Sequence, residues 1–173
     1  MPTMTWSKAN LAFETIQQRQ LLAKLASSIQ MFAEFSQDEI IEFIRHADKS
    51  VFKAGNLIIR EGEPGLFMYI IVSGSAKIVK QVDDREECLT VLSSGEAFGE
   101  MALIDNMERS ASVKAISDCT LLRISASSVR EMPTVGTKTY RNIAMLLAQR
   151  LRYSNSLASL LLHKLPNPNE NTA

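Results

Sequence analysis

Hydrophobic positions at the start of the chain recur with the period of an α-helix. Over residues 8–34 the apolar side chains keep roughly helical spacing, without proline or glycine: Leu11, Ile16, Leu21, Leu22, Leu25 and Ile29. A second, shorter helix is predicted over residues 37–46, because Ser36 precedes it and Glu39 follows three residues later, which is the pattern of a capping box. We therefore expect two helices before the first strand.

From Ser50 the pattern changes to short apolar runs separated by turn residues. The runs cover residues 50–53, 56–60, 67–72, 75–81, 87–92, 110–116 and 119–124. Ala76 and Ile78 share one face of their run, opposite Lys77 and Val79, and Leu89 and Val91 alternate with Cys88 and Thr90 in the next, so each pair is predicted to face inward. Seven or eight short strands at this spacing predict an all-β sandwich or barrel.

The chain turns helical again after Ile124. A short helix over 125–131 is expected to end before Pro133, with a loop over 133–136. A long helix follows over 137–165, with a heptad seam: Ala144, Leu147, Leu151, Ser154, Ala158, Leu161 and Leu165. Such a helix would extend roughly 40 Å, longer than the β-domain needs for its own cover. It could pack on its own domain alone, but we favour pairing with a second copy, a homodimer.

These patterns divide the chain into four parts. They are an N-terminal helical segment (1–35), a β-barrel with short helices (36–136), the C-terminal helix (137–165) and a polar, proline-broken tail expected to be disordered (166–173). At 173 residues the chain is long enough for one packed domain with an appendage.

Composition adds few constraints. Apolar residues make up 46% and charged residues 22%, as in ordinary globular proteins, and Lys+Arg and Asp+Glu balance at 19 each, so no general attraction to nucleic acid is expected. The two cysteines, Cys88 and Cys119, lack metal-ligand spacing and suit a reducing compartment. Without a signal peptide or a run of 18 apolar residues, the expectation is a cytoplasmic protein that does not insert into membranes.

Signatures of catalysis are absent from the sequence. It contains no G-x-S-x-G, phosphate-binding G-x-x-x-x-G-K-[ST], H-E-x-x-H or C-x-x-C. The two histidines, His46 and His163, are far apart, and the paired carboxylates of 83–84 and 86–87 fall in a predicted hairpin tip. We therefore expect no catalytic residues, no metal and no cofactor.

The stretch from Ser94 to Ser110 carries a candidate anion site. A glycine-containing turn leads into one predicted helical turn at 100–103, whose first amides lack internal partners, and the small Ala102 would let a ligand approach the backbone. Arg109 could complete a phosphate clamp, and Glu100 could accept from a ribose hydroxyl. Alternatively, Arg109 pairs on the surface with Glu100 or Glu108, which would contribute little. The residues by themselves leave both possibilities open.

A family resemblance favours the first possibility. The segment Phe98-Gly99-Glu100-Met101-Ala102-Leu103, followed by Arg109-Ser110-Ala111-Ser112-Val113, resembles the phosphate-binding cassette of cyclic nucleotide-binding domains. The similarity extends through Phe52-x-x-Gly55, Ile59-x-x-Gly62-x-x-Gly65, Tyr69-Ile70-Ile71 and Gly74, and covers about residues 30–155. It implies a mainly β fold: a jelly-roll barrel (double-stranded β-helix) with N-terminal helices and a long C-terminal dimerisation helix.

The resemblance also implies roles for individual residues. Glu100 would accept from the ribose 2′-hydroxyl, and Arg109 would bind the cyclic phosphate, helped by the amides of Ala102 and Ser110. The whole expected phosphate and ribose site comprises Gly99, Glu100, Met101, Ala102, Arg109 and Ser110. The residues expected to line the base and ribose are Ile78, Leu89 and Phe98.

Residues 148–156, AQRLRYSNS, resemble the dimerisation helix of bacterial activators in this family. The resemblance implies that Ser154 and Asn155 reach the adenine, which favours cAMP over cGMP. Alternatively, Ser154 is a polar seam residue that fixes helix register.

Such activators continue into a helix-turn-helix, for which we find no counterpart here. We therefore expect a stand-alone receptor that signals to an unknown protein partner and does not bind nucleic acid. Two other hypotheses are a nucleotide-free scaffold that keeps the fold and a transcription factor, which would need a DNA-binding segment. Haem or iron–sulfur sensing would need Cys or His ligands that the sequence lacks.

Overall fold

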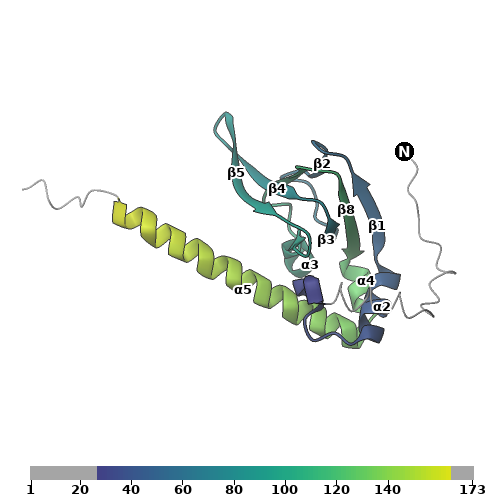
Figure 1. Ribbon diagram of the computed structural model, residues 1–173. Coiled ribbons are helices and arrows are strands. Elements are labelled where there is room, and N and C mark those ends of the chain that lie inside the picture. The colour runs from purple at the N-terminus through teal and green to yellow at the C-terminus, as the bar shows by residue number, and fades with distance from the viewer. Residues whose placement is uncertain (1–26, 165–173) are drawn as a thin grey trace, which may run out of the picture.

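The computed structural model describes residues 27–164, which form a barrel of two antiparallel sheets flanked by helices (Figure 1). The helical elements are η1 (Gln30–Phe32), α2 (Gln37–His46), α3 (Met101–Asp105), α4 (Ala126–Arg130) and α5 (Pro133–Lys164). The strands are β1 (Asp48–Phe52), β2 (Leu57–Ile59), β3 (Phe67–Ser73), β4 (Ala76–Val82), β5 (Arg85–Leu92), β6 (Ala97–Phe98), β7 (Ser112–Ala115) and β8 (Cys119–Ser125). The mainly β fold with flanking helices and a long C-terminal helix is confirmed.

The two sheets have four strands each, in the orders β1-β8-β3-β6 and β2-β7-β4-β5. Between them lies an apolar interior to which Ile71, Leu121 and Val113 contribute, and in which the rings of Tyr69 and Phe98 stack at 5.3 Å between centroids. Because side chains alternate along a strand, Met68 and Ile70 of β3 point to the other face of their sheet. There they join a second core beneath the helices, so β3 is buried on both faces.

The second core joins the helices to the sheet. Its buried members include Phe32 of η1, Phe43 of α2, Val129 of α4 and Ile143 of α5. The predicted capping box of α2 is present: the Glu39 amide donates to Ser36 Oγ, and the Ser36 amide donates to the Glu39 carboxylate. This cap fixes the start of α2, which packs beside α4 and α5.

The helix predicted over residues 8–34 lies mostly outside the described residues. Within them, Ser27 and Ser28 are helical, but the helix does not continue to residue 34. Ile29 is extended and buried, and η1 follows it as a 3-10 turn. The predicted disordered tail, 166–173, also lies outside the described residues.

The inward face predicted for Leu89 and Val91 is wrong, since both side chains are more than half exposed. Val91 lies opposite Lys77 and is exposed, whereas Leu92 pairs with Ala76 and is buried. The register shifts between Ile78 and Val79, so that Leu89 has no partner in the ladder. Val91 faces outward because side chains alternate along the strand and its neighbour Leu92 faces the interior.

The loop predicted over residues 133–136 is also wrong, because α5 begins at Pro133. Proline is favoured at the first helical position, where its missing N–H is not needed. Gly136 allows close packing on α4, since a Cβ there would lie 2.5 Å from the Val129 carbonyl oxygen. The far half of α5 projects away from the barrel (Figure 1), and within residues 27–164 no helix is long and apolar enough to cross a membrane.

Candidate functional site

The candidate site is built on the turn that joins β6 to α3. Gly99 has a φ of +71°, a left-handed conformation that glycine adopts without strain. A Cβ at Gly99 would lie 2.7 Å from Nη1 of Arg109, so the turn also leaves the space that this arginine occupies. The chain then forms α3 and returns through Asn106, itself left-handed at φ +54°, towards β7. Glu100 and Arg109 are thereby brought to the same side of the barrel.

Arg109 is buried and its guanidinium is held by backbone carbonyls. Nη1 donates to the Gly99 oxygen at 2.9 Å, and Nη2 donates to the Phe67 oxygen at 2.6 Å. No carboxylate of residues 27–164 forms an ion pair with it, although the side chain is only 9% exposed. Burial lowers the pKa of Arg109, while Tyr69, Glu100 and Glu63 act in the opposite direction at longer range. The site therefore contains a buried cation held in a fixed orientation.

Glu100 is buried beside it but pairs with another arginine. Nη1 of Arg150, on α5, donates to Oε1 of Glu100 at 2.6 Å, and Nη2 donates to the Ala97 carbonyl oxygen at 2.6 Å. The Glu100 side chain is almost fully enclosed, whereas Arg150 remains about one-third exposed. The alternative of a surface ion pair between Arg109 and Glu100 or Glu108 is therefore not what the structure contains.

The small residues of the site allow α3 to lie close to the loop before β3. A Cβ at Gly65 would come within 2.2 Å of the Ala102 Cβ, so only glycine fits there with α3 in this position. On the exposed side, Ser110 Oγ lies 4.0 Å from the Met101 sulfur. The expected phosphate and ribose residues, from Gly99 to Ser110, are thus gathered around the β6–α3 turn.

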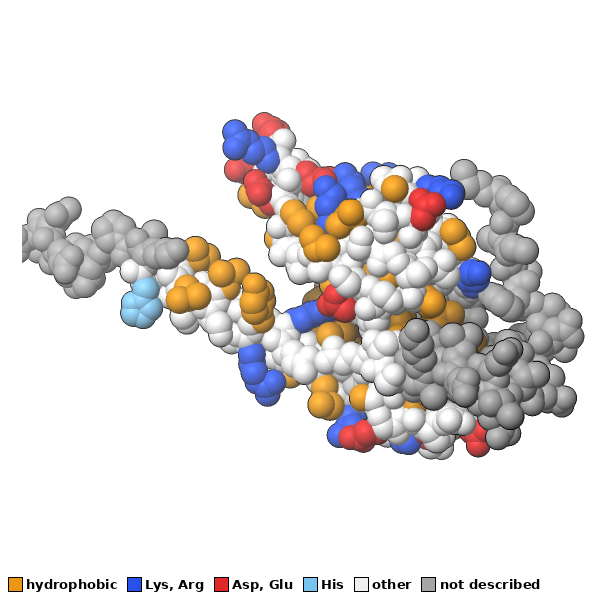
Figure 2. Space-filling view, in the orientation of Figure 1, with side chains coloured by type: hydrophobic (Ala, Val, Ile, Leu, Met, Phe, Trp, Pro, Cys, Tyr) orange, Lys and Arg blue, Asp and Glu red, His pale blue; other side chains and the backbone are white. Residues whose placement is uncertain are grey.

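The residues expected to line the base are more scattered. Phe98 is buried against Tyr69, and Ile78 is partly buried against the same interior, but Leu89 is 57% exposed on β5. Ser154 and Asn155 lie on the exposed part of α5, about one turn beyond Arg150. Both residues are exposed, and Figure 2 shows a hollow between the projecting part of α5 and the rest of the molecule.

Comparison with known proteins identifies the domain. Residues 49–133 match the family described as cyclic nucleotide-binding domain. They belong to this family. The cyclic AMP receptor protein of Thermus thermophilus is 31% identical over 136 residues, which cover 76% of this chain and 61% of that protein. The crystal structure of the catabolite activator protein of T. thermophilus superposes with a TM-score of 0.71 at 29% identity, over 76% of this chain and 62% of that one.

A second regulator is similar over a shorter length. The cAMP-activated global transcriptional regulator of Mycobacterium tuberculosis is 32% identical over 117 residues, which cover 66% of this chain and 52% of that protein. This chain therefore spans about one half to three-fifths of the length of these curated relatives. The barrel is a cyclic nucleotide-binding domain homologous to those of cAMP-responsive regulators.

Arg150, on α5 beyond the matched residues 49–133, was not among the site residues that the sequence predicted. The residue stood within the segment 148–156 but outside the heptad seam, so the pattern gave it no role. The spacing of Arg150 from Ile143 and Leu146 could have revealed it. These residues are seven and four positions earlier and face the core beneath the helices, so Arg150 lies on the same side of the helix. A charged residue that continues the buried side of a helix is expected to meet a polar group of the domain.

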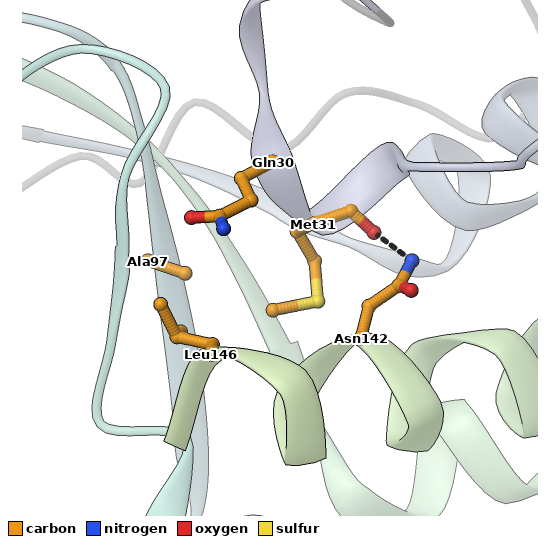
Figure 3. Close-up of a pocket in the computed structure, with 5 residues that line it drawn as sticks. All are labelled: Gln30, Met31, Ala97, Asn142 and Leu146. Carbon is orange, nitrogen blue, oxygen red and sulfur yellow. Dashed lines mark hydrogen bonds between the residues drawn. The ribbon is translucent and has the colours of Figure 1, made fainter. Parts of the chain in front are cut away.

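A second contact between α5 and the domain surrounds a small cavity (Figure 3). It is lined by Gln30, Met31, Ala97, Asn142 and Leu146, and its volume of about 10 Å³ is near that needed for one water molecule. Asn142 Nδ2 donates to the Met31 and Ala33 carbonyls, while its Oδ1 has no hydrogen-bond partner in the described part of the chain. The cavity is too small for a nucleotide and lies at the joint between η1 and α5.

Residues 27–164 also contain no group of three or more side chains able to hold a metal ion.

Proposed function

We propose that this protein is a receptor for a cyclic nucleotide, with cAMP favoured over cGMP. The observation that carries the proposal is the buried guanidinium of Arg109, which has no carboxylate partner within residues 27–164 and lies beside the buried carboxylate of Glu100. A buried cation is costly unless it is paired. A cyclic phosphate would supply the missing negative charge.

The neighbouring groups suit the rest of the ligand. Arginine presents several N–H donors in a plane, so the donors not used by the Gly99 and Phe67 carbonyls can bind phosphate oxygens. A carboxylate has about four acceptor sites, so Glu100 can accept from a ribose hydroxyl in addition to Arg150. The amides of Ala102 and Ser110 would assist at the phosphate. We assign no catalytic residue, metal or cofactor, because binding requires no bond to be broken.

Arg150 suggests how binding would be transmitted. A ribose hydroxyl bound to Glu100 would weaken the bond from Arg150, because the two donors would share one carboxylate, and the contact that ties α5 to the β6–α3 turn would loosen. The helix would then shift relative to the barrel, and a separate protein would recognise the altered surface. A ligand can shift this equilibrium only by the difference between its affinities for the two arrangements.

The proposed receptor is a cytoplasmic homodimer paired through α5. Leu151 and Leu161 of the heptad seam are more than half exposed in the single chain, which supports a second copy as the partner. In such a dimer Ser154 and Asn155 would lie near the base and favour adenine. The names of the relatives from T. thermophilus and M. tuberculosis, which refer to cAMP, support the same ligand.

Calorimetric titration of the full chain with cAMP, cGMP and a cyclic dinucleotide tests the proposal. We expect saturable binding of cAMP, weaker binding of cGMP and none of the dinucleotide. The proposed receptor function would be wrong if no ligand gave heat at millimolar concentration and amide exchange in α5 stayed unchanged. A nucleotide-free scaffold would then be favoured. Tight binding of cGMP or of the dinucleotide alone would overturn the choice of cAMP.

A further inference from the structure

The projecting half of α5 carries a second apolar stripe that the heptad seam does not include. Tyr153, Leu157 and Leu160 are 74%, 47% and 61% exposed and follow one another at steps of four and three residues. The same steps lead back to Arg150 and Leu146, which face the domain. One residue of a helix turns by about 100°, so this stripe lies about a quarter of a turn from the seam. A partner helix on the seam would leave it exposed.

The described part of the chain begins near the start of this stripe. Ser27 and Ser28 are helical, and the Ser28 carbonyl oxygen lies 2.2 Å from the position that a Cβ of Gly95 would take. Two residues later, Gln30 Nε2 donates to Gln149 Oε1 at 2.7 Å. The described part of the chain therefore begins beside α5, close to Gln149.

The length and pattern of residues 8–26 fit the stripe. The sequence predicts a helix that includes residues 8–26, which would span about 28 Å, and α5 extends about 22 Å from Gln149 to its end. Leu22 and Leu25 are three residues apart, so they would share one side of that helix.

We propose that residues 8–26 pack as an antiparallel helix on the second stripe of α5 and cover Tyr153, Leu157 and Leu160. This interaction goes beyond nucleotide binding and leaves the heptad seam available to a second copy. It joins the N-terminal segment to the element that Arg150 ties to Glu100. A shift of α5 would then move both helices together as one surface.

Thiol accessibility in the full chain, without nucleotide, tests this packing. In a Cys88→Ser background, Leu157→Cys and Ser159→Cys place thiols two residues apart on different sides of α5, while Cys119 is buried. We expect maleimide to label Leu157→Cys at least about fivefold more slowly than Ser159→Cys. Adding Leu22→Ser and Leu25→Ser should abolish this difference, and hundredfold dilution of the protein should leave it unchanged.

Each other result counts against the proposal. Equal labelling rates at the two positions would show that nothing covers the stripe. Protection that survives the Leu22→Ser and Leu25→Ser substitutions would assign it to another segment or a partner, and protection that disappears on dilution would assign it to a second copy. Circular dichroism of the four variants checks that α5 remains helical.

Discussion

Arg109 combines burial, positive charge and a fixed orientation in a single residue. Two carbonyl oxygens offset part of its desolvation cost, but a carbonyl carries only a partial charge. Burial lowers the pKa of the guanidinium, because it removes water from the charged form. Arginine stays protonated in proteins, so an anion is the natural partner.

Replacement of Arg109 tests this role. We expect Arg109→Leu to weaken cAMP binding by at least about 100-fold, because hydrogen bonds to charged groups contribute roughly 1.5–3 kcal/mol each. Arg109→Lys keeps the charge but loses the planar donor pair, so an intermediate loss is expected. Calorimetry measures both affinities, and binding by the leucine variant within threefold of the wild type would exclude Arg109 as the phosphate ligand.

Gly65 gives a prediction about the position of α3. Gly65→Ala should lower both stability and cAMP affinity, because its Cβ would lie 2.2 Å from the Ala102 Cβ and must displace α3. Ala102→Gly removes the opposing methyl, at a helix-propensity cost of about 1 kcal/mol. The double variant should therefore bind cAMP more tightly than Gly65→Ala alone. If it does not, the close approach of these two residues does not control the site.

Among the elements, α5 has the most varied connections. Its first half packs on the core beneath the helices, and polar contacts fasten it to η1, to α2 and to the β6–α3 turn. Beyond Arg150, α5 has no such contacts with the barrel within the described residues. Changes at the contacts should therefore alter the helix orientation before they alter the barrel.

Arg150→Met tests the contact with the β6–α3 turn. We expect a loss of roughly 2 kcal/mol in the free energy of unfolding, since the buried Glu100 would lose its ion-pair partner. Amide exchange in residues 146–156 should become faster. Addition of Glu100→Gln removes the unpaired charge and should recover part of the stability but not the slow exchange. Unchanged exchange in Arg150→Met would show that this pair does not hold α5.

The contact between α2 and α5 predicts that the stability of the protein depends on pH. The hydrogen bond from Lys138, followed by that from the Ser36 amide, lowers the pKa of Glu39 below its ordinary 4.5. A lowered carboxyl pKa in the folded state stabilises the protein above about pH 4.5, and this stabilisation is lost as the pH falls through the folded-state value. Glu39→Gln should thus be less stable than the wild type at pH 7, by under about 1 kcal/mol for such a surface pair.

Urea unfolding from pH 7 to pH 3 measures this effect. The difference between wild type and Glu39→Gln should shrink as the pH falls below about 4.5. Asp38→Asn, a change of the same kind in the same helical turn, serves as the control. A difference that stays constant over this range would show that the charge of Glu39 does not stabilise the contact.

For the whole molecule, the exposed apolar face of α5 predicts self-association. Leu151→Asp combined with Leu161→Asp should convert the dimer to a monomer, because charges would face each other across the heptad seam. Ser156→Asp combined with Ser159→Asp adds the same charge away from the seam and should leave the dimer intact. Sedimentation velocity gives the masses, and a wild-type protein that is monomeric at 100 μM would contradict pairing through the heptad seam.

Local patterns made much of the fold predictable. The capping box at Ser36 and Glu39 was visible because its residues are three apart, and the cassette from Phe98 to Val113 was visible because its glycines and charges lie in one stretch. The predictions failed where packing against another strand or helix decided the local structure. Val91 of β5 faces outward because it pairs with Lys77 of β4. The residues predicted as a loop after Pro133 are helical, and Gly136 among them packs closely on α4.

The sequence by itself determined the order of helices and strands, the apolar interior and the candidate residues Glu100 and Arg109, since these depend on periodicity and short-range spacing. Only the tertiary structure decided what those two side chains touch. Arg109 meets the carbonyls of Gly99 and Phe67, and Glu100 meets Arg150 from fifty residues away. Such partners come from segments distant in the chain, and their meeting depends on how the barrel and α5 pack together.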